Sequence, residues 1–436
     1  MTEYTKNLHI KSDNLVPAFV AVLFMFLGIA IKLPVLLLAV LLLGLIYFSF
    51  FNVNPLIPLS VGFIALLPLR IPVEFFGINL ELYHLFLVSV FTTASSFIAG
   101  MVHKKKITLS LPFFWLLLVW LVLVTVQLPR AIDVRVTSYN LKNTSLMMLF
   151  FYLCFNIIKA KDLKKILFYF VLVSAPIALI GIAQHIFKFF FVENCNLPEF
   201  RAMGTLYHPN DFAMYLMLVI VLGVALVIDY GKKRISYYLS ALVVLDFIAL
   251  IMTYSRSMWI CLFVSVFVLL FFINKKYILI LFGVFLAALV VMPGTSREKF
   301  LKPVNLSDNS HVARVNMVKN AWNMIKTAPV FGVGDANSYY LYDKYAEFES
   351  FGSKKIHTQI ITLTAEYGLF GLAFFVLLLA AFTMKMLEKI KSAKKHDKIF
   401  KTAFFSLCIA LFLNAQFNGS FLYEPYVWLV FSLALL

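Results

Sequence analysis

Apolar runs divided by short clusters of lysine make up most of this 436-residue chain. A membrane-spanning helix needs roughly 20 apolar residues, and fewer where neighbouring helices bury its ends. Cutting the sequence at its charges and prolines predicts spans at 15–31, 34–51, 56–69, 81–102, 108–128, 144–158, 164–190, 209–228, 235–253, 257–273, 277–292, 357–384, 402–418 and 421–436. The short blocks at 56–69 and 144–158 fit this length least well. The pattern therefore predicts an all-α, polytopic transmembrane helical bundle of 12 to 14 spans.

One long polar stretch, from Met292 to Lys355, interrupts the apolar pattern. It divides the chain into transmembrane helices at 1–291, a large and partly helical loop at 292–356, and C-terminal transmembrane helices at 357–436. Inside the loop, helical spacing after a capping residue, Ser310, predicts an amphipathic helix. On its helical wheel Arg314 falls on the apolar side, while Asn316, Asn320 and Asn323 share the polar side.

The composition excludes a soluble class of protein. Hydrophobic residues account for 62% of the chain and charged residues for 14%, and the mean hydropathy is +0.92. Three of the four cysteines lie in apolar blocks, and no Cys or His spacing indicates a disulfide framework, a metal site or a cofactor. We interpret the first apolar block as a retained signal anchor.

Lysine positions predict the orientation in the membrane. With alternating spans and an internal N-terminus, about 21 cations lie in loops on one side and 8 in short loops on the other. By the positive-inside rule the richer side is cytoplasmic, which places the large loop outside the cytoplasm. The net charge of +17 follows mostly from this topology and does not indicate nucleic-acid binding. The cytoplasmic run Lys385–Lys401 indicates contact with anionic membrane lipids.

Seven of the eight arginines fall on the predicted external side, and only Arg234 falls on the cytoplasmic side. A guanidinium presents a rigid donor fork that matches phosphate oxygens two at a time. Arg256 lies in a break of about three residues between two apolar helices, and a charge at the hydrocarbon edge needs a wet cavity or an anionic partner. The alternatives for these arginines are snorkelling to the interface, lipid headgroups and pairing with acids. The last two are the simpler interpretation for Arg70, Arg130, Arg135 and Arg297.

His357 opens the apolar run that follows the large loop. A helix N-terminus and nearby lysines both disfavour an imidazolium, so the sequence predicts a neutral imidazole that can accept a proton. A purely structural role at the membrane interface is the alternative. Its position after the loop makes His357 our candidate for a general base.

An ordered set of short motifs carries a family resemblance from Arg201 to the C-terminus. The set comprises Arg201-Ala202-Met203-Gly204-Thr205, His208-Pro209-Asn210, Ser255-Arg256-Ser257, Arg314 with Trp322, Pro329, Phe331-Gly332-Val333-Gly334, His357, and Glu366-Tyr367-Gly368-Leu369-Phe370-Gly371-Leu372. Together they resemble the O-antigen ligase and polymerase superfamily of bacterial envelope enzymes. The resemblance implies a metal-independent glycosyltransferase that acts outside the cytoplasmic (inner) membrane on a glycan preassembled on undecaprenyl diphosphate.

The resemblance also implies roles for individual residues. Arg256, Arg314 and Arg201 would bind the donor diphosphate, and His357 would activate the acceptor hydroxyl. The family has Asn after this His, whereas Thr358 follows here, which bears on the orientation of the imidazole. Supporting candidates are Asn210, Gly334, Asp335 and Tyr339. For Gly334 and Asp335 a structural turn is the simpler interpretation, and for Tyr339 it is the aromatic belt.

The sequence does not decide which molecule accepts the glycan. A ligase would transfer the glycan to the core sugar of lipid A, which the position of the single large loop favours, and a polymerase would use a second lipid-linked glycan. A flippase or transporter would also have many spans, but it predicts internal repeats, and we find no convincing repeat in the sequence. No carboxylate is placed for a covalent intermediate, which favours inversion at the anomeric carbon.

Overall fold

A computed structural model describes residues 73–75, 78–80, 110–189, 200–206, 208–291, 309–349, 354–419, 421–422 and 424–436. The predicted spans at 15–31, 34–51, 56–69 and 81–102, the signal anchor, Arg70 and Arg297 lie outside these residues. The chain forms two compact units. The first comprises residues 1–109 and 153–254, and the second comprises residues 110–152 and 255–436.

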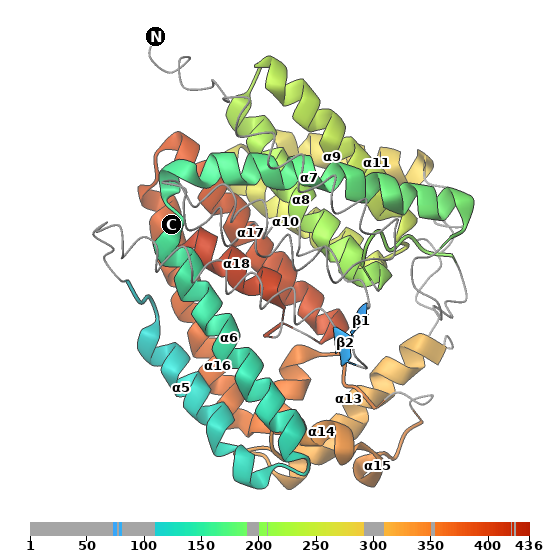
Figure 1. Cartoon of the computed structure of the whole chain (residues 1–436), viewed down its shortest axis with the longest axis vertical. Helices are drawn as coiled ribbons and strands as arrows, with labels where there is room; N and C mark the ends of the chain where they lie inside the picture. The colour runs from blue at the N-terminus through green and yellow to red at the C-terminus, as the bar shows by residue number, and fades with distance from the viewer. Residues whose placement is uncertain are drawn as a thin grey trace. The chain divides into compact units, whose positions relative to one another are not determined.

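Three helices dominate the described part of the first unit: α7 (Ala160–Phe187), α8 (Pro209–Tyr230) and α9 (Arg234–Met252). They pack against one another (Figure 1). Gly223 allows α8 to approach α9 closely, because a Cβ at this position would lie 2.5 Å from the Val243 side chain on α9. The buried carboxyl of Asp246 on α9 lies 2.8 Å from the Ser174 hydroxyl on α7. Polar contacts as well as apolar packing therefore join these helices.

The first unit also contains two short strands, β1 (Val73–Phe75) and β2 (Ile78–Leu80), which pair antiparallel with Val73 opposite Leu80. The sequence predicts an all-α fold, so this hairpin is a local departure from the prediction. Strands of three residues are too short to produce the alternation from which a strand is recognised.

Helices α10, α16 and α17 form the frame of the second unit. Helix α10 (Arg256–Ile273) packs along α17 (Lys395–Asn418), and α17 packs on α16 (Gln359–Ser392). The hydroxyl of Ser265 donates to that of Ser406 across the first contact, at 3.0 Å. The remaining helices that the structure describes in this unit are α5 (Phe114–Val126), the 3-10 helix η3 (Leu128–Arg130), α6 (Val134–Ile157, which continues into the first unit), α11 (Tyr277–Val291), α13 (Asn309–Thr327), α14 (Asn337–Tyr340), α15 (Tyr342–Tyr345) and α18 (Pro425–Ala434).

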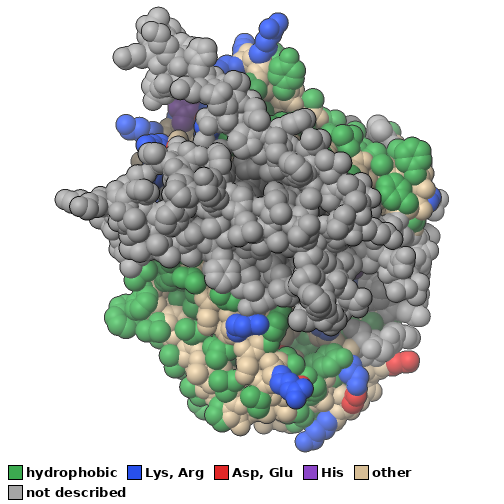
Figure 2. Space-filling model, in the orientation of Figure 1, with side chains coloured by type: hydrophobic (Ala, Val, Ile, Leu, Met, Phe, Trp, Pro, Cys, Tyr) green, Lys and Arg blue, Asp and Glu red, His purple; other side chains and the backbone are tan. Residues whose placement is uncertain are grey.

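Within the described residues, six helices are long and apolar enough to cross a membrane: α7, α8, α9, α10, α16 and α17. They confirm the predicted spans at 164–190, 209–228, 235–253, 257–273, 357–384 and 402–418 as apolar helices, with ends shifted by a few residues. Hydrophobic side chains also cover much of the described surface in Figure 2. On α5, for example, Trp115 is 74% exposed. Such a surface is suited to contact with lipid.

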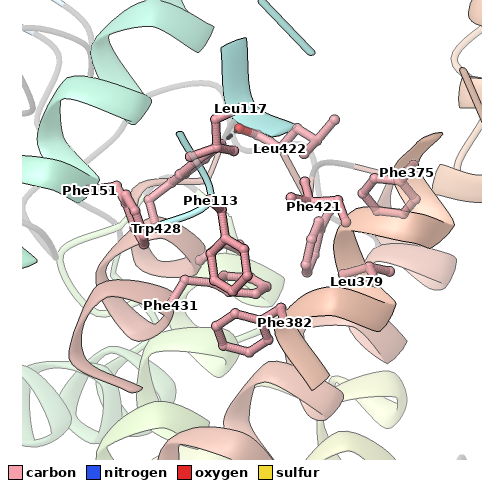
Figure 3. A pocket seen from close by; sticks show the side chains of 12 residues that line it. Phe113, Leu117, Phe151, Phe375, Leu379, Phe382, Phe421, Leu422, Trp428 and Phe431 are labelled. Carbon is pink, nitrogen blue, oxygen red and sulfur yellow. Dashed lines mark hydrogen bonds between the residues drawn. The ribbon is translucent and has the colours of Figure 1, made fainter. Parts of the chain in front are cut away.

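Aromatic side chains join the last helix to α16. Figure 3 shows a pocket with an entirely apolar lining: Phe113, Leu117, Phe151, Phe375, Leu378, Leu379, Phe382, Phe421, Leu422, Val427, Trp428 and Phe431. The rings of Phe382 and Phe431 are 4.2 Å apart, centroid to centroid, and those of Phe421 and Phe431 are 5.9 Å apart. These contacts fix the loop between α17 and α18 on α16.

The polar stretch between α11 and α16 contains α13, α14 and α15, which gather at one end of α16 (Figure 1). Two details of the predicted loop helix are wrong. Helix α13 begins at Asn309, so Ser310 lies inside it rather than at its N-cap. Asn320, predicted on the polar side, is completely buried, whereas Arg314, predicted on the apolar side, is exposed.

Hydrogen bonds explain why an asparagine occupies the buried side of α13. The Asn320 amide nitrogen donates to the Tyr342 hydroxyl at 2.9 Å and to the Phe348 carbonyl at 2.8 Å. Its amide oxygen accepts from the backbone N–H groups of Glu347 and Phe348, each at 3.1 Å. A helical wheel shows only the polarity of positions within one helix. The partners of Asn320 lie beyond the end of α13 in the chain, so the wheel could not reveal them. Asn320 thus satisfies backbone groups of Glu347 and Phe348, which follow the end of α15.

Replacing Asn320 by alanine is expected to lower the free energy of unfolding. The change leaves buried donors and acceptors without partners, at a cost of about 1–3 kcal/mol for each such group. Denaturant unfolding of the purified protein in detergent would measure the loss. Asn323→Ala is the matched control, since Asn323 is only half-buried, donates one long hydrogen bond, 3.4 Å, to the Tyr345 carbonyl and accepts an exposed one, 3.1 Å, from Lys326. Equal effects of the two changes would contradict a special role for Asn320.

Candidate functional site

Arg314 and His357 are held together by the core of the second unit. Ala313, which precedes Arg314, and Ile356, which precedes His357, belong to the same buried cluster. The other members are Met317, Ala321, Met324, Ile325, Tyr342 and Ala365, with Val333, Tyr345 and Ile361 packed against them. Because interiors are close-packed, this cluster limits how far α13 can shift relative to the start of α16. The positions of the Arg314 and His357 side chains relative to each other are restricted by the same packing.

The backbone around His357 is fixed from the opposite side by the end of α17. Gly419, the C-cap of α17 with φ 70°, packs so closely that a Cβ there would lie 3.0 Å from the His357 carbonyl oxygen. The Gln416 side chain accepts from the Ile360 N–H at 3.3 Å, and the Gln359 side chain accepts from the Phe421 N–H at 3.0 Å. Gln416, Gly419 and Phe421 lie about sixty residues from His357 in the sequence, so the sequence alone did not reveal these contacts.

Arg256 is the first residue of α10, and Ser255 is its N-cap. A cation at this end of a helix meets the positive end of the helix dipole, which is unfavourable without an anion nearby. The Arg256 side chain is half-buried. Packing of α10 along α17 determines where this helix end lies within the unit.

Electrostatics connect the three side chains. Although Arg314 as a whole residue is exposed, surrounding protein partly desolvates its guanidinium and lowers its pKa, and the charge of Arg256 lowers it further. Burial also lowers the pKa of His357 below its ordinary value of 6.5, with smaller contributions from the charges of Arg314 and Lys355. Among the residues that the structure describes, no carboxylate forms an ion pair with Arg314. The second unit therefore holds two mutually repelling guanidinium groups and an imidazole that is neutral at neutral pH.

The lowered pKa of His357 agrees in direction with the sequence prediction, but its main cause differs. The sequence indicates repulsion by cations and by the helix dipole, whereas burial is the largest cause. His357 lies two residues before α16, because Thr358 is the N-cap. The Thr358 carbonyl accepts from the Thr362 hydroxyl at 3.0 Å. A local hydrogen bond thus orders the backbone on which the imidazole is carried.

Arg201 and Asn210 belong to the first unit. The Arg201 Nε donates to the Thr253 carbonyl at 2.7 Å, and its terminal Nη2 donates to the Asn210 side-chain oxygen at 3.0 Å. The neighbouring Ala202 N–H donates to the Met252 carbonyl at 3.0 Å. These bonds satisfy carbonyl groups at the C-terminus of α9, where a cation is favoured. Burial lowers the pKa of Arg201 to about 10. Arg201 thus caps α9, a role that the sequence motif did not reveal.

Gly334, Asp335 and Tyr339 lie at a junction between the loop and α16. The Gly334 N–H donates to the Glu366 carbonyl at 2.9 Å, so this donor is already used by the backbone. The buried Asp335 carboxylate accepts from the Tyr367 hydroxyl at 2.7 Å and from the Asn140 amide at 3.0 Å. Tyr339 is 53% exposed. The structural interpretation fits Gly334 and Asp335, and Tyr339 keeps a face for contact with a ligand or with lipid.

Arg130 also holds this junction, although the sequence favours headgroup or acid contacts for it. Its guanidinium donates to the Phe331 carbonyl at 3.2 Å and to the Gly332 carbonyl at 2.5 Å. Asn337 donates in turn to the Arg130 carbonyl at 2.8 Å. The described residues contain no group of three or more His, Cys, Asp and Glu side chains that could hold a metal ion.

Comparison with known proteins identifies the part of the chain that carries this arrangement. Residues 241–376 match the family model described as O-antigen ligase. This stretch is similar to the O-antigen ligase family. The matched O-antigen ligase segment includes Arg256, Arg314 and His357 but neither Arg201 nor Asn210. It confirms the family resemblance that the sequence motifs indicate.

The chain is also similar to the teichuronic acid biosynthesis protein TuaE of Bacillus subtilis (strain 168). The two are 25% identical over 333 residues, which is 68% of this chain. The match covers 66% of the Bacillus protein, slightly less than two thirds of its length.

The electrostatic coupling predicts how His357 titrates in a variant of its neighbour. In Arg314→Gln one source of repulsion is gone, so the pKa of His357 should rise towards 6.5. Diethyl pyrocarbonate acylates neutral imidazole, and peptide mass spectrometry of His357 across a pH series would give the midpoint. Lys319→Gln, on the same helix and packed over Phe348, should leave the midpoint unchanged. A midpoint that does not move in Arg314→Gln would show that the two groups do not interact.

Proposed function

We propose that the protein is a membrane glycosyltransferase that moves a preassembled glycan from undecaprenyl diphosphate to an acceptor hydroxyl. The observation that carries this proposal is the combination of Arg256, Arg314 and a neutral His357 in one unit. Two guanidinium groups that repel each other are stabilised by an anion that contacts both. A lipid diphosphate is such an anion, and the O-antigen ligase match supports this class of substrate.

The reaction needs few groups. The acceptor oxygen attacks the anomeric carbon of the donor, the bond from that carbon to the diphosphate oxygen breaks, and the acceptor proton passes to His357. The leaving undecaprenyl diphosphate takes the bonding electrons, and Arg256 and Arg314 stabilise its charge. A single displacement of this kind inverts the anomeric carbon. This chemistry places no demand on a metal ion, so we expect the rate to be insensitive to a chelator.

The topology that accompanies this proposal follows from the lysines. We propose 12 to 14 spans in a bacterial cytoplasmic (inner) membrane, with residues 292–356 and the reaction on the outer, periplasmic side. Contact of the cytoplasmic lysines with anionic lipids fits this orientation. The six described apolar helices are compatible with it.

The acceptor distinguishes two candidate functions. The similarity to a protein of teichuronic acid biosynthesis is compatible with a polymerase, for which a second lipid-linked glycan would be the acceptor. The O-antigen ligase match favours a single transfer, for which lipid A-core is the acceptor. We place the ligase first, because the matched family model is described as O-antigen ligase, and keep the polymerase as the second candidate. A flippase needs no general base and is supported less well by a neutral His357 near the Arg314 guanidinium.

His357→Ala should lower the turnover number for transfer by about 10²–10⁴-fold, the usual contribution of a general base. Binding of the lipid-diphosphate donor should persist, since the arginines remain. The assay uses purified protein in vesicles, a lipid-diphosphate glycan, and either a second such donor or lipid A-core, with products separated by size. A ladder of products indicates a polymerase and a single larger product indicates a ligase. Full activity of His357→Ala would exclude this residue from the reaction.

Arg256→Lys keeps the charge and removes the two-pronged geometry. Charge-assisted hydrogen bonds contribute about 1.5–3 kcal/mol each, so the loss of one should lower kcat/KM by roughly ten- to hundredfold. Arg135→Lys is the matched control, because Arg135 is an exposed arginine to which we assign no role in the reaction. If both variants transfer as fast as the wild type, Arg256 acts only as a charge.

A further inference from the structure

Helix α16 consists of two helices joined at a break. Gly368 has φ 68° and ψ −169°, a backbone conformation that is essentially restricted to glycine. The first part, residues 359–367, follows His357 after two residues, and the second part continues to Ser392. The break therefore gives the His357 end of α16 a direction of its own.

The break leaves N–H and carbonyl groups of α16 without partners inside the helix. The loop segment 329–334 forms hydrogen bonds with these groups. The Val333 N–H donates to the Ala365 carbonyl at 2.8 Å, and the Gly334 N–H donates to the Glu366 carbonyl at 2.9 Å. In return, the Leu369 N–H donates to the Pro329 carbonyl at 2.8 Å, and the Phe370 N–H donates to the Val330 carbonyl at 3.1 Å. Two chain segments thus exchange four backbone hydrogen bonds across the junction.

The junction closes only because glycine faces backbone on both sides. A Cβ on Gly332 would lie 2.3 Å from the Glu366 carbonyl carbon. A Cβ on Gly368 would lie 2.2 Å from the Val330 carbonyl oxygen. Real Cβ atoms essentially never approach other atoms this closely, and backbone cannot rotate away as a side chain can. Any side chain at either position must separate the loop from α16.

Side chains reinforce the same contact. The Tyr367 hydroxyl donates to the Asp335 carboxylate at 2.7 Å, and the Ser338 hydroxyl donates to the Glu366 carboxylate at 2.6 Å. The junction also begins immediately after α13, since the Gly332 N–H donates to the Ala328 carbonyl at 2.9 Å. It therefore connects the helix that carries Arg314 with the helix that starts beside His357.

We propose that Gly332 and Gly368 are positioning residues, whose close backbone contact sets the position of His357 relative to Arg314 for the transfer reaction. This inference rests on the proposed function for its kinetic consequence. The proposed effect on position concerns only the side chains of His357 and Arg314 and does not depend on that function. The charged groups that act on His357 are Arg314 from α13 and Lys355 from its own segment, while the facing end of α17 contributes the uncharged Gln416 and Gly419.

The test compares Gly332→Ala and Gly368→Ala with the wild type in the pH series of His357 acylation and in the transfer assay. Separation of the junction should move His357 away from Arg314 and make it more hydrated. The midpoint of acylation should then rise by about half a pH unit, the effect of removing one unit charge from a few ångströms away in a water-like medium. The turnover number should fall by about tenfold or more, with a smaller change in KM.

Two glycine variants control for the substitution itself. Gly283→Ala places a methyl group on α11 where nothing lies within 4 Å, and Gly231→Ala introduces strain at φ 59° without any contact. Neither should change the midpoint. Tyr367→Phe is a milder change that removes one junction hydrogen bond while keeping the ring, and it should shift the midpoint in the same direction by a smaller amount.

The outcomes separate this proposal from the proposed function. If the folded Gly332 and Gly368 variants have the midpoint of the wild type, the positioning role is overturned, even where their yield is reduced. If the wild type shows no transfer but the midpoint shifts as expected, the positioning role stands and the transferase function fails.

Discussion

Backbone polar groups in a membrane protein must find partners within the protein, because the bilayer core has no water to supply them. The break in α16 at Gly368 would leave carbonyl and N–H groups without partners in the middle of an apolar helix. Residues 329–334 supply all four of the partners described above. The polar loop is therefore part of the structure of α16, and the position of His357 depends on this exchange.

The sequence predicted the features that follow from local pattern. Apolar runs gave the six helices that can span a membrane, since length and composition alone decide this property. The predicted break that contains Arg256 lies between α9 and α10, although α10 begins at Arg256 itself, one residue before the predicted span. Cations next to His357 gave the right direction for its pKa. The motif order from Arg201 onward gave the family, which the match to residues 241–376 confirms.

Features that depend on distant partners were not predictable. Asn320 lies on the buried side of α13 because four hydrogen bonds to residues 342–348 satisfy its amide, and a helical wheel contains no such information. Arg130 and the candidate diphosphate ligand Arg201 each bind backbone carbonyls of residues distant in the sequence. Gly332 and Gly368 allow two backbones to touch, which the motifs that contain them do not show. Residue type indicated chemistry in each case, and the partners were visible only in the three-dimensional contacts.

The facing glycines also restrict how this chain can change over evolution. Enlarging one residue separates both segments, so a second enlargement opposite it would add little further damage, and the two effects would not sum. Recovery would instead require shortening or redirecting the loop, which no single replacement achieves. The two positions, far apart in the sequence, should therefore hardly vary, singly or together, while the loop keeps its length and direction.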